Sequence, residues 1–198
     1  MALKLRIFGL ITVLVLALAA MTSREAAHAA LSCPGQTSAR PFVPWLDFGN
    51  YVAVPNGSFE STSGWSLVNG AAVVSGNEPW KVNRSTDSRS LYLPSGSSAT
   101  SPPLCVTLLH PTLRFFAANS GPLLTTLRVD AITDVLGIKT TIPIGLVVAG
   151  SWRPTLPLLT VDNLLSPVTG TLQFRFTPVG SNSGWRIDDV YVDPFKQR

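Results

Sequence analysis

Short stretches of alternating apolar and polar residues recur along this 198-residue chain, and none after residue 30 has helical periodicity. In Thr125–Thr133, Leu127, Val129 and Ala131 would share one face, and in Thr171–Val179 apolar residues again alternate with polar ones. Successive side chains of a strand point to opposite faces of a sheet, so this pattern would bury one face of each strand. Gly, Pro, Ser and Asn separate the stretches. Many short strands with regular turn signals predict an all-β sandwich.

The first residues of the chain have the layout of a secretory signal peptide. Lys4 and Arg6 precede an apolar run, Ile7–Ala20, and small residues follow at Ala27–Ala30. We place the signal peptide at residues 1–29, which makes the mature protein secreted and extracellular. The apolar run is shorter than the roughly 20 residues that a membrane span needs. We therefore expect no membrane span in the mature chain, and an uncleaved anchor is the less favoured alternative.

The chain has two cysteines, Cys33 and Cys105. In an exported protein such a pair is usually joined in a disulfide bond. The bond would tie a Pro-rich N-terminal arm, residues 30–52, to one sandwich domain at residues 53–195. Burial of two aromatic residues would also help to order this arm: Trp45 and Phe48.

The distribution of charge argues against a nucleic-acid-binding protein. The chain has 15 Lys and Arg residues and 11 Asp and Glu residues, and removal of the signal peptide would bring this balance nearer to neutrality. The basic residues are scattered singly, whereas nucleic-acid-binding domains gather them on one face.

Motifs of catalysis are also missing from the sequence, which contains no G-x-S-x-G elbow, phosphate-binding loop or H-E-x-x-H helix. His110, the single histidine after residue 29, precedes a proline between apolar runs, which favours a structural role. A glycosidase needs two carboxylates that flank a cleft. Asp188 and Asp189 are neighbours on a predicted strand and would point to opposite faces. We expect no enzymatic activity.

Two motifs near the ends of the predicted domain carry a family resemblance. Asn56-Gly57-Ser58-Phe59-Glu60 is followed by Gly64-Trp65, and the last predicted strand contains Ile187-Asp188-Asp189-Val190. In order and separation these motifs resemble the calcium-dependent jelly-roll carbohydrate-binding modules that are attached to bacterial cellulases and xylanases. These modules belong to the galactose-binding-like superfamily. The resemblance covers Val54–Asp193 and implies a jelly-roll β-sandwich.

The resemblance also implies that the first and last strands lie side by side and share a structural Ca²⁺ ion. Calcium takes about 6–8 oxygen ligands from carboxylates and carbonyls. Glu60 and Asp188 are the side chains that we expect to bind it, and Asp189 is a less favoured candidate. The turn at Asn56 and Gly57 would direct carbonyl groups toward the ion, because glycine tolerates positive φ. In the alternative interpretation, Glu60 is a solvated strand end and the two aspartates cap a turn.

A sugar site needs an exposed aromatic ring, because sugars present apolar C–H faces as well as hydroxyl edges. Trp80 is the first candidate, since Asn77 and Glu78 lie within three residues of it and could hold hydroxyl groups, and Trp152 is the second. The sequence leaves open that both tryptophans anchor loops onto the sandwich. The tryptophans beside the terminal motifs are expected in the core: Trp65 and Trp185.

These observations favour a secreted, non-catalytic protein that binds a poly- or oligosaccharide and holds structural calcium. The alternative is an extracellular structural or adhesive envelope protein of the same fold that binds a protein partner. One fold supports many functions, so the fold does not choose between them. Exposure of Trp80 and Trp152 in a shared groove would favour the first.

Overall fold

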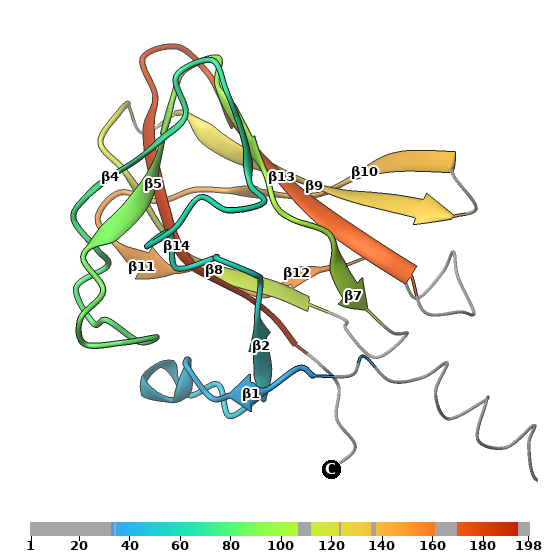
Figure 1. The fold of residues 1–198 in the computed structure, drawn as a ribbon. Helices are drawn as coiled ribbons and strands as arrows, with labels where there is room; N and C mark the ends of the chain where they lie inside the picture. The colour runs from blue at the N-terminus through green and yellow to red at the C-terminus, as the bar shows by residue number, and fades with distance from the viewer. Residues whose placement is uncertain are drawn as a thin grey trace, which may run out of the picture.

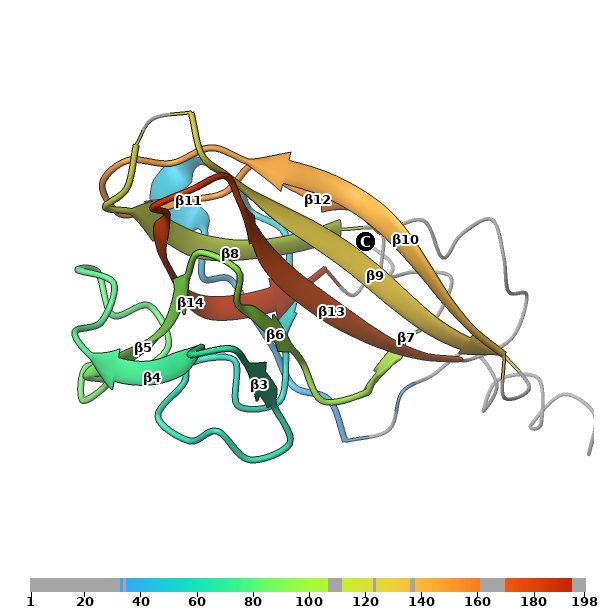
Figure 2. The same ribbon diagram turned by 90° about the horizontal axis from the view of Figure 1, so that it is seen from above.

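The computed structural model describes residues 33, 35–106, 112–122, 124–135, 138–160 and 170–193. Within these ranges the chain forms two antiparallel sheets that pack face to face (Figure 1 and Figure 2). The first sheet has the spatial order β1 (Ser38–Ala39), β2 (Tyr51–Ala53), β14 (Gly184–Val192), β5 (Arg89–Pro94) and β4 (Ala72–Ser75). The other side of β14 pairs with β8 (Thr112–Asn119), and β8 in turn pairs with β11 (Arg153–Pro154) and β12 (Leu158–Leu159).

The second sheet has the spatial order β10 (Ile138–Val147), β9 (Thr126–Val135), β13 (Gly170–Val179), β6 (Ser98–Thr100) and β3 (Ser66–Val68). A further strand, β7 (Leu104–Val106), also pairs with β13. The predicted all-β sandwich is therefore confirmed. In β10 the pairing register shifts between Pro143 and Gly145, because proline has no N–H group to donate to the ladder.

The core lies between the two sheets and is built from the alternation seen in the sequence. Leu113, Phe115 and Ala117 of β8 point into it, and so do alternate residues of β13, among them Phe176. The rings of Phe115 and Phe176 meet edge to face, with centroids 5.1 Å apart. Burial of each such ring contributes roughly 1.5–3 kcal/mol to stability. The tryptophans predicted in the core are buried there: Trp65 and Trp185.

The two ends of the domain lie side by side, as the resemblance implies. Val52 of β2 pairs with Val192 of β14, and the N–H of Val190 donates to the carbonyl of Gly57 at 3.1 Å. The reason for glycine differs from the expected one, since Asn56 takes the positive φ of 53°. A Cβ on Gly57 would instead lie 3.0 Å from the carbonyl oxygens of Val190 and Val54. Close approach of the backbones explains this glycine.

The N-terminal arm is fastened to the body of the sandwich. The predicted disulfide is confirmed: Cys33 and Cys105 are bonded, with their Cα atoms 5.7 Å apart. After β1, a short 3-10 helix, η1 (Val43–Trp45), ends at Leu46, whose φ is 59°. Phe48, which follows this reversal, is 63% exposed, so the predicted burial of its ring is wrong. Phe42, on the other side of the turn, is buried instead.

No helix in the described ranges is long and apolar enough to cross a bilayer. The predicted signal peptide and its apolar run Ile7–Ala20 lie outside the described residues. The same is true of His110.

Candidate functional site

A bulge in β14 places two adjacent carboxyl groups inside the protein. The register between β14 and β8 shifts between Asp188 and Tyr191, and Asp189 has a φ of 48°. Asp188 and Asp189 are 0% and 2% exposed. The bulge interrupts the strict alternation of the strand, and both carboxyl groups are buried although they lie next to each other in the sequence.

Asp188 fastens the loop between β4 and β5 to the last strand. One carboxylate oxygen accepts the N–H of Glu78 at 3.0 Å, and the other accepts the N–H of Asp189 at 2.9 Å. Burial raises the pKa of Asp188 to about 9, and the neighbouring charge of Asp189 adds to this. Both oxygens of Asp188 are thus committed to backbone groups of the chain.

Glu78 lies inside the same loop and shapes it. The side chain is fully buried, and its two oxygens accept the N–H groups of Trp80 at 2.6 Å and Val82 at 2.7 Å. Asn77 is partly buried, and its amide donates to the carbonyl of Glu78 at 3.0 Å. The prediction that Glu78 contacts a sugar does not fit this burial. A carboxylate that holds the backbone of a loop leaves no face for a ligand on the surface.

Asp189 has a buried carboxyl group with one oxygen atom that is unsatisfied among the described residues. Burial raises its pKa to about 8, and the charges of Glu78 and Asp87 raise it further. Its Oδ2 atom is buried and, within the described part of the chain, accepts no hydrogen bond. Asp87 is 3% exposed and accepts the side-chain amide of Asn83 at 2.8 Å. A buried carboxyl group such as that of Asp189 retains a proton at neutral pH unless a cation offsets its charge.

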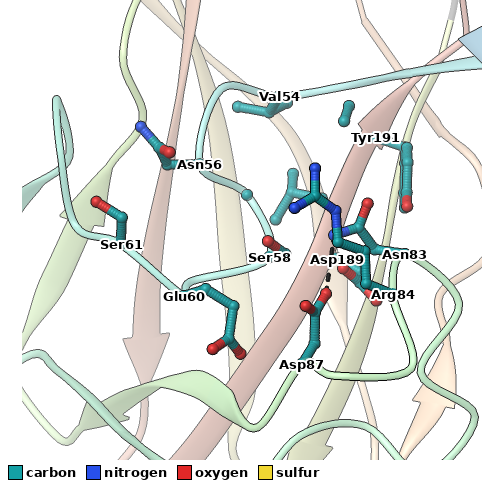
Figure 3. A pocket seen from close by; sticks show the side chains of 13 residues that line it. Val54, Asn56, Ser58, Glu60, Ser61, Asn83, Arg84, Asp87, Asp189 and Tyr191 are labelled. Carbon is teal, nitrogen blue, oxygen red and sulfur yellow. Dashed lines mark hydrogen bonds between the residues drawn. The ribbon is translucent and has the colours of Figure 1, made fainter.

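Glu60 and Asp189 line one polar cavity of about 230 Å³, shown in Figure 3, and Asp87 and Arg84 also line it. Glu60 is exposed, and its Oε1 accepts the N–H groups of Ser88 and Arg89. Asp188 is absent from the lining of this cavity. The structure therefore brings Glu60 together with Asp189, the less favoured candidate, while Asp188 faces the β4–β5 loop.

The cavity fits a hard cation in the type of its donors. Carboxylate oxygens from three separate segments line it, and one of them, Asp189 Oδ2, lacks a donor. Calcium prefers such oxygen ligands. As arranged, however, no three His, Cys, Asp or Glu side chains among the described residues are grouped closely enough to hold a metal ion. Asp87 had no signal in the sequence, because only the fold brings its loop to β14.

An aromatic cluster covers the outer face of the first sheet. Phe116 of β8 points away from the core, opposite to its neighbour Phe115, and packs with buried aromatic residues of the arm, β2 and β14: Phe42, Tyr51 and Tyr191. Trp45 and Trp152 are partly buried against this cluster. Figure 1 shows η1 and the β4–β5 loop at the same side of the molecule.

Trp80 is the exposed member of this group. Its ring centroid lies 5.0 Å from that of Trp45 and 5.6 Å from that of Phe116, while 46% of its surface remains exposed. Trp152 precedes β11, where Arg153 pairs with Ala117 next to Phe116. The two predicted sugar-binding tryptophans therefore lie at one cluster. Trp80 is exposed there, whereas Trp152 is partly buried.

No protein-family model and no curated protein sequence matches this chain. Solved structures of other proteins are similar. The enzymatically active domain of tailspike protein 4 from bacteriophage CBA120 is 22% identical, with a TM-score of 0.49 over 71% of this chain. A Clostridium thermocellum endo-1,4-β-D-xylanase 10B fragment that contains the CBM22-1 and GH10 modules, complexed with xylohexaose, is 14% identical, with a TM-score of 0.46 over 70% of this chain.

The chain spans 21% of that tailspike and 28% of that xylanase fragment. It spans 95% of a family 11 carbohydrate-binding module from Clostridium thermocellum in complex with a β-1,3-1,4-mixed-linked tetrasaccharide. That module is 12% identical, with a TM-score of 0.40 over 71% of this chain. At these identities and TM-scores, the similarity concerns the β-sandwich alone.

Proposed function

We propose that this chain is a secreted, non-catalytic carbohydrate-binding protein in which a glycan stacks on Trp80. The observation that carries the proposal is an indole ring that is 46% exposed and yet held in place. The carboxylate of Glu78 accepts a hydrogen bond from the backbone N–H of Trp80, and the indole ring packs against Phe116. A fixed aromatic surface of this kind offers large contact area at a small cost in conformational entropy.

Polar groups near Trp80 can meet the hydroxyl edges of a sugar. Lys81 is exposed beside it, and Arg153 is exposed beside Trp152. Asn77 Oδ1, which has no hydrogen-bond partner among the described residues, is buried and does not face the surface. A few polar groups around an aromatic surface fix the orientation of a ligand. The Cys33–Cys105 bond agrees with export, since disulfides persist in oxidising compartments.

The proposal includes a structural Ca²⁺ ion where the two ends of the domain meet. Glu60, Asp87 and Asp189 would supply oxygen atoms from three segments, and they would have to move closer together than they are in the structure to do so. Asp188, the ligand expected from the resemblance, would support the ion indirectly by fixing Glu78 and the β4–β5 loop. Burial raises the pKa of the two buried aspartates, Asp188 and Asp189, and so favours their protonated form. The positive charge of the ion would favour the ionised form instead.

Catalysis forms no part of the proposal. Glycoside hydrolysis needs two carboxyl groups on either side of an accessible cleft. The neighbouring carboxyls of Glu78, Asp188 and Asp189 are at most 2% exposed.

Isothermal titration with xylohexaose, a β-1,3-1,4-mixed-linked tetrasaccharide and β-1,4-galactotriose tests the proposed function. We expect the wild-type protein to bind at least one of them and Trp80→Ala to lose that binding. Leu124→Ala is the control, because Leu124 is 95% exposed and lies outside the aromatic cluster. Equal affinity of the wild type and Trp80→Ala would contradict the proposal.

A protein partner is the second candidate function, and an apolar surface favours it. Leu146, Val148 and Leu156 are 63%, 63% and 81% exposed, and they line a cavity of about 640 Å³ between β10 and the segment that contains β11 and β12. Exposed apolar patches often mark protein interfaces. If no sugar binds, and Leu156→Asp abolishes a complex that forms with an isolated envelope protein, this alternative would replace the first.

A further inference from the structure

The N-terminal arm is docked onto the outer face of the first sheet by a defined set of contacts. Phe42 stacks on Phe116 with ring centroids 5.5 Å apart, and the guanidinium of Arg114 lies 4.4 Å from the centroid of Phe42. Arg114 also forms an ion pair with Asp47, and the hydroxyl of Tyr51 donates to Asp47 at 2.6 Å. These contacts fix the position of η1.

This docking brings an arm residue against the proposed sugar platform. The rings of Trp45 and Trp80 are perpendicular, with centroids 5.0 Å apart. Trp45 also meets Phe116, with centroids 5.2 Å apart. Trp45, Phe116 and Trp80 thus form a closed group of three rings. Trp80 is the most exposed of the three.

We propose that the N-terminal arm is part of the glycan-binding site, and that Trp45 is a positioning residue that holds the ring of Trp80. This inference rests on the proposed function. Without Trp45, the Trp80 ring would have contacts to Phe116 alone within this group and could leave the orientation in which a sugar stacks. Binding would then have to order that side chain again, which costs affinity.

The arm lies outside the part of the chain that resembles carbohydrate-binding modules, Val54–Asp193. A site that includes Trp45 would therefore be a property of this chain. The disulfide and the Asp47–Arg114 ion pair both hold the arm that carries Trp45. They would therefore affect glycan binding as well as the stability of the fold. The order of the arm and the affinity for glycan would then be coupled.

The test compares Trp45→Ala, Trp45→Phe and Phe48→Ala by titration with the oligosaccharide that the wild type binds most tightly. Ordering one side chain on binding corresponds to an affinity loss of about threefold to tenfold, which we expect for Trp45→Ala. Trp45→Phe should recover part of the affinity. Phe48→Ala should bind like the wild type, because Phe48 is an exposed aromatic residue of the same arm that is not part of this group of rings.

Two further readouts separate positioning from a general loss of structure. The exciton-coupled circular dichroism of two indoles in contact should disappear in Trp45→Phe, which keeps the fold, and should persist in Trp152→Phe. Asp47→Asn weakens the contacts of Asp47 with Arg114 and Tyr51, which hold the arm, and leaves every aromatic ring in place. It should also lower the affinity for the oligosaccharide.

Unchanged affinity in Trp45→Ala, for a sugar whose binding requires Trp80, overturns this inference and leaves the proposed function intact. A wild-type protein that binds none of the three oligosaccharides overturns both.

Discussion

Asp188 of β14 accepts a hydrogen bond from the N–H of Glu78 at 3.0 Å, although 110 residues separate the two in sequence. The carboxylate of Glu78 in turn accepts hydrogen bonds from the N–H groups of Trp80 and Val82, and so fixes the backbone of the loop. The last strand of the sandwich is thereby connected, through two buried carboxyl groups, to the loop that presents Trp80. Loops that carry binding residues are commonly held by such a rigid scaffold.

Replacing Glu78 with alanine should loosen this loop. The N–H groups of Trp80 and Val82 would lose their acceptor, and an unsatisfied buried donor costs about 1–3 kcal/mol. We expect urea unfolding to show a loss of about 2 kcal/mol in the free energy of unfolding. Lys81→Ala, in the same loop but exposed, should change it by less than about 0.5 kcal/mol. A loss as small for Glu78→Ala would show that the loop is held by other contacts.

Calcium should stabilise the protein, and Asp189 should be necessary for this effect. At a concentration of calcium about 100 times its dissociation constant, binding adds about 2.7 kcal/mol to the stability of the folded state. Chelator should therefore lower Tm in the wild type and leave Asp189→Asn unaffected, as followed by differential scanning calorimetry. Asp47→Asn, whose carboxylate lies outside the cavity, should keep the full shift. An identical wild-type Tm with calcium and with chelator would refute the metal site.

The attachment of the arm should weaken in acid. Burial acts to raise the pKa of Asp47, but hydrogen bonds from Tyr51, Gly49 and Arg114 outweigh burial and hold the pKa below its usual value. A carboxyl whose pKa is lower when folded stabilises the folded state above its unfolded pKa of about 3.9. This stabilisation is lost as the pH falls through the lower, folded pKa.

Proteolysis of the arm measures this pH dependence. Pepsin should cut within the arm faster as the pH falls below about 4, and in Asp47→Asn the rate should be high over the whole acid range. The range from pH 5 to pH 2 extends from about one unit above to about two units below the usual pKa of that carboxyl. Cleavage of the wild-type arm at a rate that does not change over this range would show that Asp47 does not hold the arm.

Gly57→Ala should destabilise the contact between the two ends of the domain. Its Cβ would lie 3.0 Å from two carbonyl oxygens, those of Val54 and Val190. Overpacking of this kind costs about 1–3 kcal/mol. Gly150→Ala is the matched control, because a Cβ there meets no atom within 4 Å. Equal stability of the two variants in urea would mean that the backbones at Gly57 separate without cost.

The sandwich itself could be predicted from the sequence because alternation is local. Apolar residues of Thr171–Val179 occupy every second position, and the same residues point into the core. The adjacency of the two ends of the domain was implied by the family resemblance that the two terminal motifs carry. Each of these signals lies within a few neighbouring residues.

The details of the site depended on contacts that no local pattern records. The bulge at Asp189 requires a positive φ, which an aspartate in the sequence does not predict. As a result Asp189, the less favoured candidate ligand, lines the same cavity as Glu60. Burial of Phe42 instead of Phe48 followed from the reversal at Leu46. The contact of Trp45 with Trp80 depends on how the arm docks. Tertiary packing decided all three.

A glycan array with wild-type protein and Trp80→Ala, each with calcium and with chelator, tests the central claim most directly. The account predicts that the wild type is retained by at least one class of glycan, that Trp80→Ala is not, and that chelator weakens the wild-type signal. A blank array for folded, calcium-loaded wild-type protein would contradict it.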